Sequence, residues 1–219
     1  MHSCARRWHL LTAVAALLAL VLQLVLVMSG SAVLAEDEGP GLAARTARFF
    51  GYFTIQANAL VAATTAVLAR DPAYDGPRWR AFRGAATVGI TITGLVHFVL
   101  LRPLLDLDGL DRLADSLLHL VVPALAVAGW LIFGPRPRIG LRELSLAFLW
   151  PVAWLLVTFA VRAATGWVPY PFLDPDGDAG WAGVTIACVG ITVLFALTAL
   201  AVHAVDRRLA PQPTIPAGR

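Results

Sequence analysis

Six long apolar stretches constrain this chain more than any other feature, because each is about as long as the hydrocarbon core of a bilayer is thick. A helix rises ~1.5 Å per residue, so ~20 residues cross a core of ~30 Å, and the third and fourth stretches only just suffice. Lipid offers backbone groups no hydrogen-bond partners, so each stretch should be helical. The stretches cover residues 8–29, 49–69, 84–101, 116–133, 144–163 and 181–205.

The composition supports the same class of protein. Charged residues make up 14% of the 219 residues and hydrophobic residues 58%, whereas a soluble domain carries about 25% charged residues. Trp8, Trp130 and Trp181 stand at the ends of apolar stretches, which is typical of the membrane interface. We therefore predict an all-α, polytopic membrane protein whose single domain, residues 1–208, is a bundle of six transmembrane helices.

The arginines are distributed unevenly and predict an orientation. Arginine-poor loops follow the first, third and fifth stretches, and these loops hold most of the acidic residues. The positive-inside rule then places both termini in the cytoplasm, which six spans allow. The Pro-rich end, residues 209–219, is expected to be a disordered cytoplasmic tail. The arginines on the predicted cytoplasmic side are Arg6, Arg7, Arg70, Arg78, Arg80, Arg83, Arg136, Arg138, Arg142, Arg207, Arg208 and Arg219.

The first stretch has a second interpretation as a cleaved signal peptide. "SAVLAEDE" resembles a signal-peptidase site after Ala35, and Arg6 and Arg7 precede the apolar run. That run, from Leu10 to Val27, is longer than the ~7–15 residues of a usual signal-peptide core. We therefore expect the first helix to be retained, and the other five are the same either way.

Three polar side chains within the apolar stretches should lie at a similar depth. Polar groups in a membrane are costly unless they have partners, so they are the first places to look for function. At ~1.5 Å per residue, Thr54, His97 and His119 all fall a few ångströms below the predicted outer surface. Taken alone, Thr54 has an ordinary explanation, since threonine in a helix commonly bonds a carbonyl three or four residues back.

His119 requires partners in lipid, and the sequence offers some. Asp115 lies four residues earlier on the same helix face, where a carboxylate would fix the imidazole tautomer. Asp115 can equally be a helix N-cap. Pro123 removes the N–H that would bond the His119 carbonyl and should kink the helix there. His97 is either a second member of this site or a contact between helices.

Two further side chains near Thr54 and one outer segment complete the candidates. Asn58 lies four residues after Thr54 on the same face, whereas Gln56 points elsewhere and can seat the helix at the headgroups. The spacing of the histidines and aspartates matches no metal-ligand motif, so we expect no metal and no other cofactor. The segment 165–181, "TGWVPYPFLDPDGDAGW", cannot be helical at its prolines and is expected to cap the outer mouth. It can also be an ordinary interfacial loop.

Three stretches carry a resemblance to a known family. "YFTIQANALV", "HLVVPALAVAGWLIFGPR" and "TGWVPYPFLD" resemble the bacterial Pr-six-Pr membrane proteins over about residues 49–181. More distantly, they are similar to the eukaryotic androgen-induced and androgen-dependent membrane proteins of the FAR-seventeen-a type. The sequence departs from the pattern at Gly129, where an acidic residue is expected before the tryptophan, and at Val168, where an aromatic residue is usual. The resemblance implies a bacterial inner (cell) membrane location.

The eukaryotic relatives imply an activity, the hydrolysis of fatty-acid esters of hydroxy fatty acids by a Thr–His pair. By motif, the threonine falls on Thr54 and the histidine on His119. A threonine hydroxyl needs a base within ~2.6–3.2 Å, and neutral histidine is suited to that role. Candidate donors to the oxyanion are Asn58, Gln56 and His97.

The expected partners follow from this interpretation: membrane lipids and a lipid-ester substrate, with no nucleic acid. The alternative function is a non-catalytic membrane protein that binds a lipid or a partner, in which the same side chains form a structural polar network. A transporter is disfavoured because no span has a charged residue at its middle and the chain has no repeated half.

Overall fold

The computed structural model describes residues 2–31, 41–134, 136 and 139–209. Within them the secondary structure is helical, and no strand occurs. Short π-helical turns (η1, His97–Leu101; η3, Leu117–Val121) and 3-10 turns (η2, Arg102–Leu104; η4, Pro171–Leu173) join some of the helices. The α-helices are α1 His2–Met28, α2 Leu42–Gly51, α3 Phe53–Arg70, α4 Pro77–Val96, α5 Gly109–Ser116, α6 Val122–Phe133, α7 Leu141–Ala147, α8 Leu149–Thr165 and α9 Gly180–Arg208.

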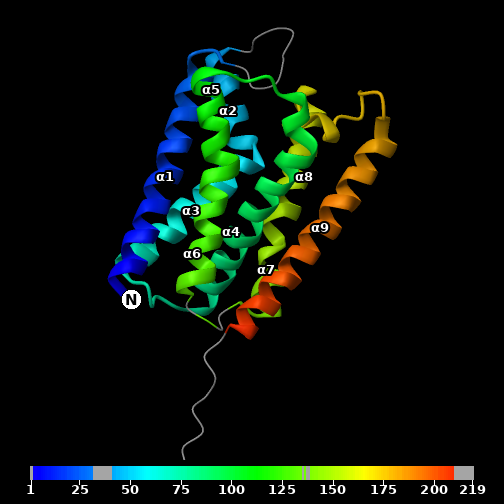
Figure 1. Cartoon of the computed structure of the whole chain (residues 1–219). Coiled ribbons are helices and arrows are strands. Elements are labelled where there is room, and N and C mark those ends of the chain that lie inside the picture. Colours follow the sequence, from blue (N-terminus) through cyan, green and yellow to red (C-terminus); the bar gives the residue numbers. More distant parts are fainter. Residues whose placement is uncertain (1, 32–40, 135, 137–138, 210–219) are drawn as a thin grey trace, which may run out of the picture.

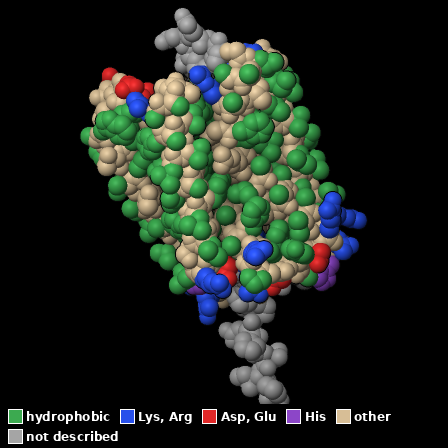
Figure 2. All heavy atoms as spheres, turned by 180° about the vertical axis from the view of Figure 1, so that it is seen from behind, with side chains coloured by type: hydrophobic (Ala, Val, Ile, Leu, Met, Phe, Trp, Pro, Cys, Tyr) green, Lys and Arg blue, Asp and Glu red, His purple; other side chains and the backbone are tan. Residues whose placement is uncertain are grey.

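These helices form an integral, multi-pass membrane protein. Five helical segments are long and apolar enough to cross a bilayer, and the bent pair α2–α3 makes a sixth if it counts as one span. Large apolar side chains cover the outside of the bundle, and Leu156 and Ile186 are 68% and 73% exposed. On the face in Figure 2, charged side chains gather toward the two ends and leave a hydrophobic middle. This is the surface that a lipid environment requires.

α4 lies at the centre of the bundle and packs against α3, α6, α7 and α9. In the span that contains it, 61% of the most apolar stretch is buried, compared with 17–28% in the other continuous spans. α1 packs closely along α3, where Ala16, Ala19 and Ala57 are fully buried in one cluster. Small side chains let helix backbones approach closely, which is how membrane helices commonly associate.

Both described ends of the chain, at His2 and Leu209, lie at the same end of the bundle, and α2, α5 and η4 lie at the opposite end (Figure 1). We call these the terminal end and the capped end. Beyond Leu209, the predicted disordered tail lies outside the described residues. The possible cleavage site after Ala35 lies outside them as well.

Several helices differ from the apolar stretches that predicted them. The second stretch is interrupted at Tyr52, where the chain turns by 66° between α2 and α3. The helices of the third, fourth and fifth stretches begin earlier than expected, at Pro77, Gly109 and Leu141. Their first turns are polar, and the predicted stretches began only where the sequence becomes apolar. Pro123 was expected to kink its helix. In the structure a π-helical turn precedes the proline, and α5, η3 and α6 together form one span.

Candidate active site

The start of α3 directs the hydroxyl group of Thr54 away from its own helix. Other threonines in the spans donate to the carbonyl four residues back; these are Thr64, Thr65 and Thr93, which are buried, and Thr91, Thr185 and Thr192, which are not. Thr54 is the second residue of α3, so the residue four positions earlier, Phe50, lies beyond the 66° bend. The Phe50 carbonyl accepts a hydrogen bond from Gln56 Nε2 instead. The ordinary explanation for a membrane threonine therefore does not apply to Thr54.

Thr54 contacts polar groups from two other parts of the chain. Its Oγ1 lies 3.3 Å from His119 Nε2 and 3.4 Å from Tyr170 Oη. Its backbone N–H also donates to Tyr170 Oη, at 3.2 Å. The Thr54–His119 distance exceeds the ~2.8 Å of an ideal hydrogen bond, as is common in catalytic pairs before substrate tightens the site. A buried hydroxyl group thus faces an imidazole nitrogen.

His119 lies in the π-helical turn η3, and His97 begins the other π-helical turn, η1. Each turn ends two residues before a proline, Pro103 and Pro123 respectively. Proline lacks the N–H that closes a normal helical turn and crowds the preceding turn, which favours the wider i→i+5 pattern. Such turns occur often at functional sites, because they change the direction of side chains without ending the helix.

The other ring nitrogen of His119 faces only acceptors among its closest contacts. Nδ1 lies 3.0 Å from the Asp115 carbonyl oxygen and 2.8 Å from Asp115 Oδ1. In a neutral imidazole, Nδ1 therefore carries the proton and Nε2 presents its lone pair to Thr54. The same carboxylate stabilises positive charge on the ring when Nε2 takes a proton.

His97 lies directly on His119. The two imidazoles stack with centroids 3.8 Å apart and planes 9° from parallel, and His97 Nε2 lies 3.3 Å from Asp115 Oδ2. Gly94 makes this approach possible, since a Cβ at that position would lie only 3.2 Å from the His119 carbonyl oxygen. Each oxygen of the Asp115 carboxylate thus lies close to one imidazole.

His97, Asp115 and His119 also form a group that could hold a metal ion. Their ligand atoms lie within 4.8 Å of one another, a proximity that sequence spacing did not predict. A metal ion lies ~2.0–2.1 Å from a histidine nitrogen, in the direction of its in-plane lone pair. One ion cannot occupy that position for two rings stacked in parallel 3.8 Å apart. The arrangement as it stands fits a hydrogen-bonded dyad with Thr54 better than a metal centre.

Two of the predicted supporting residues have other contacts. Asn58 donates both amide hydrogens to backbone carbonyls, those of Thr54 at 2.9 Å and Leu118 at 3.2 Å. It therefore ties α3 to η3 and has no hydrogen left for an oxyanion. Gln56 bonds Phe50 O and accepts from Trp150 Nε1 at 2.8 Å, on another face of α3. The structure thus gathers Thr54, His97, Asp115 and His119 at one site and leaves Gln56 outside it.

Tyr170 belongs to this site, although sequence reasoning did not single it out. It lies between α8 and α9 in the segment expected to be a cap, and that segment folds over Thr54. Its ring stacks on Phe172 at 5.2 Å and packs edge-on against Tyr52 at 5.7 Å. Burial raises the pKa of the Tyr170 hydroxyl, so the group keeps its proton at neutral pH. Pro171 was the available signal, because a proline holds the residue before it, here Tyr170, in an extended backbone.

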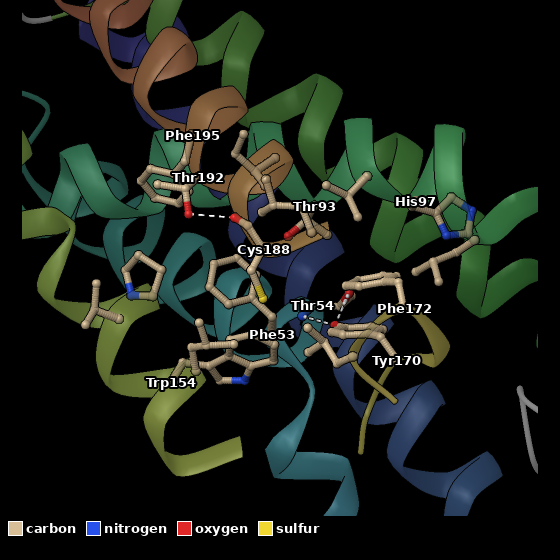
Figure 3. Close-up of a pocket in the computed structure, with 18 of the residues that line it drawn as sticks. Phe53, Thr54, Thr93, His97, Trp154, Tyr170, Phe172, Cys188, Thr192 and Phe195 are labelled. Carbon is tan, nitrogen blue, oxygen red and sulfur yellow. Dashed lines mark hydrogen bonds between the residues drawn. The ribbon is translucent and has the colours of Figure 1, made fainter. Parts of the chain in front are cut away.

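A cavity of about 140 Å³ adjoins Thr54 and lies between α4, α8 and α9. Figure 3 shows Cys188 and Thr192 of α9 above the rings of Phe53 and Trp154, with Thr54, Tyr170 and Phe172 to one side. Most of the lining is apolar. The polar lining groups with contacts outside their own helix are Thr54, His97, Tyr170 and the indole N–H of Trp154, which donates to the Gly51 carbonyl at 2.8 Å. The lining thus suits an apolar ligand with a polar group at one end.

Comparison of the chain with protein-family models, with curated proteins and with solved structures finds no match.

Proposed function

We propose that this protein is a threonine-type hydrolase of lipid esters in a bacterial inner membrane. One observation carries the proposal: Thr54 Oγ1 faces His119 Nε2, while His119 Nδ1 faces Asp115. This nucleophile–base–carboxylate order generalises the serine-hydrolase triad. The distant resemblance to the eukaryotic threonine hydrolases implies the same two residues.

The reaction has two steps. Thr54 Oγ1 attacks the ester carbonyl carbon as its proton moves to His119 Nε2, and the imidazolium lies beside the Asp115 carboxylate. The ester bond breaks, the leaving alkoxide takes the proton from His119, and the acyl group remains on Thr54. Water then attacks this acyl group with His119 again as the base, releasing the fatty acid and restoring the Thr54 hydroxyl.

Tyr170 is the best-placed donor to the developing oxyanion. Its oxygen accepts the Thr54 N–H, so its own proton remains for an acceptor next to Thr54 Oγ1. A carbonyl oxygen attacked by Thr54 would lie near this hydroxyl group. An oxyanion-hole donor of this kind contributes about 10²–10³-fold to a rate. We assign this role to Tyr170 in place of Asn58 and Gln56.

The topology that fits this function has six spans, with α2–α3 as one bent span, and both termini in the cytoplasm. The uneven distribution of arginine supports this orientation. The capped end then faces outward, and the Thr54 hydroxyl lies a short distance below the headgroups. A lipid ester has its carbonyl group at that depth, and water reaches it there.

The experiment compares labelling by a fluorophosphonate probe in membranes. Thr54→Val removes the hydroxyl with little change in volume, and His119→Gln removes the base; each should reduce labelling to background. Thr64→Val is the matched control, since Thr64 is a buried threonine of the same helix whose hydroxyl group bonds its own backbone. Labelling that survives in Thr54→Val would show that another residue is the nucleophile.

The same contacts also support a second function, a non-catalytic membrane protein that binds lipid or a partner. Thr54, His97, Asp115 and Tyr170 join α3, η1, α5 and the cap, so the network can be purely structural. In that case wild type would show neither labelling nor ester turnover, and the Thr54→Val, His119→Gln double variant would lose thermal stability.

A further inference from the structure

α8 and α9 contact each other at both ends of the cavity. Toward the terminal end, Phe148, the residue just before α8, and Phe195 of α9 meet edge to face at 4.6 Å. Toward the capped end, Phe159 lies 6.0 Å from Trp181, and the Arg162 guanidinium lies 5.7 Å from the same indole. Arg162 also pairs with Asp176 at 2.7 Å. These contacts fix the two ends of a gap between the helices.

Between these contacts, the cavity opens sideways. Val152 and Leu155 of α8 and Cys188 and Thr192 of α9 line it, and Val152 is also 53% exposed on the outside of the bundle. Within the described residues, α9 packs closely against α4 and η4 rather than against α8. We call the space bordered by these four residues the lateral opening. It faces the lipid, since both helices are spans with exposed apolar sides.

The lining hydroxyl groups that are not used within their own helix lie at one end of the cavity. The hydroxyl groups of Thr93 and Thr192 donate to carbonyls of their own helices, at 3.0 and 2.7 Å, which satisfies both donors. Thr54 and Tyr170, in contrast, form the only described pair of lining hydroxyl groups that contact each other, at 3.4 Å. A ligand that fits this arrangement has one polar group, beside Thr54, and a hydrocarbon portion directed toward α9.

We propose that one acyl chain of a membrane lipid ester enters through the lateral opening and lies in this cavity with its carbonyl group at Thr54. This inference rests on the proposed function and adds the route and the binding site. An apolar cavity of ~150 Å³ holds a molecule the size of benzene, so the 140 Å³ here holds only the carbons nearest the carbonyl. The rest of the chain extends through the opening into the bilayer. The enzyme therefore discriminates against branching near the carbonyl and tolerates different chain lengths.

The test is photo-crosslinking in proteoliposomes with two oleoyl esters, one with a diazirine near the carboxyl group and one with a diazirine at the far end of the chain. The protein carries Thr54→Ala, so the result reports binding and is independent of hydrolysis. We expect the first probe to label cavity residues such as Phe53 and Ile191, and the second to label the outer sides of α8 and α9.

Two blocking variants and one control complete the test. Thr192→Trp should fill the lateral opening and reduce cavity labelling by the first probe at least fivefold. Val152→Trp, on the opposite side of the opening, should reduce cavity labelling in the same way. It replaces Thr192→Trp in the test if that variant does not insert into the membrane. Ile186→Trp is the control, because Ile186 lies on α9, is 73% exposed and does not line the cavity.

The crosslinking results can be distinguished from the results that test the proposed hydrolase activity. Equal labelling patterns for the two probes, or cavity labelling that both blocking variants leave unchanged, would overturn the lateral binding site even if Thr54 is the nucleophile. Cavity labelling that is position-dependent and blocked by tryptophan would support the site even if no ester is hydrolysed.

Discussion

Asp115→Asn separates two contributions of the carboxylate to the His119 base. The substitution removes the negative charge beside His119 Nδ1, but the Asp115 backbone carbonyl remains 3.0 Å from that nitrogen. This carbonyl keeps Nδ1 protonated and Nε2 available to Thr54. The change should therefore remove charge stabilisation while preserving the tautomer.

The expected magnitude follows from the contact that is lost. A hydrogen bond to a charged group contributes about 1.5–3 kcal/mol, and ~1.4 kcal/mol corresponds to a factor of ten in rate. The second-order rate of fluorophosphonate labelling should therefore fall by about 10–150-fold. If the carboxylate were the only acceptor that fixed the tautomer, its loss would reduce the rate by about 10⁴-fold, as in the serine-protease triad.

The assay is a time course of labelling in purified, reconstituted protein, with thermal unfolding measured in parallel. Ser116→Ala is a suitable control, because Ser116 is the next residue on the same helix and has no hydrogen bond of its side chain in the described structure. A change smaller than twofold in Asp115→Asn would refute the role of the carboxylate. A loss of 10⁴-fold with unchanged stability would refute the tautomer argument.

Three further predictions follow from the same contacts. Tyr170→Phe should reduce the labelling rate by about 10²–10³-fold, because it removes the proposed oxyanion donor, and a rate close to that of wild type would exclude the role. Gly94→Ala places a Cβ 3.2 Å from the His119 carbonyl oxygen, so it should lower the free energy of unfolding by about 1–3 kcal/mol and reduce labelling; an unchanged melting temperature would contradict this. Incubation with EDTA should change the labelling rate by less than about twofold, since the stacked rings do not fit one metal ion. A loss restored by Zn²⁺ would favour a metal centre instead.

The fold class was predictable from the sequence because the length of an apolar run is a local property. The bilayer sets that length, and five or six helices in the structure meet it. The bend at Tyr52 was not predictable in this way. Its extended backbone is accompanied by edge-on contacts of the Tyr52 ring with Trp167 and Tyr170, residues more than a hundred positions away. That bend is what frees the Thr54 hydroxyl from its own helix.

The candidate site was predictable only in part. Depth along each span placed Thr54, His97 and His119 in one layer, and the structure brings their side chains together. Helical periodicity placed Gln56 on another face of α3 from Asn58, and there it bonds Trp150. Depth alone could not exclude it as an oxyanion donor. The stacking of His97 on His119 depends on two π-helical turns and on Gly94, and the contribution of Tyr170 depends on the fold of the cap.

The most direct test of the central claim is to locate the covalent adduct by tandem mass spectrometry after fluorophosphonate labelling of the wild-type protein in membranes. The account predicts a phosphonylated peptide with the modification on Thr54, absent from His119→Gln and present in Thr64→Val. An adduct on any other side chain, or no adduct on Thr54 when the protein is correctly inserted, would contradict it.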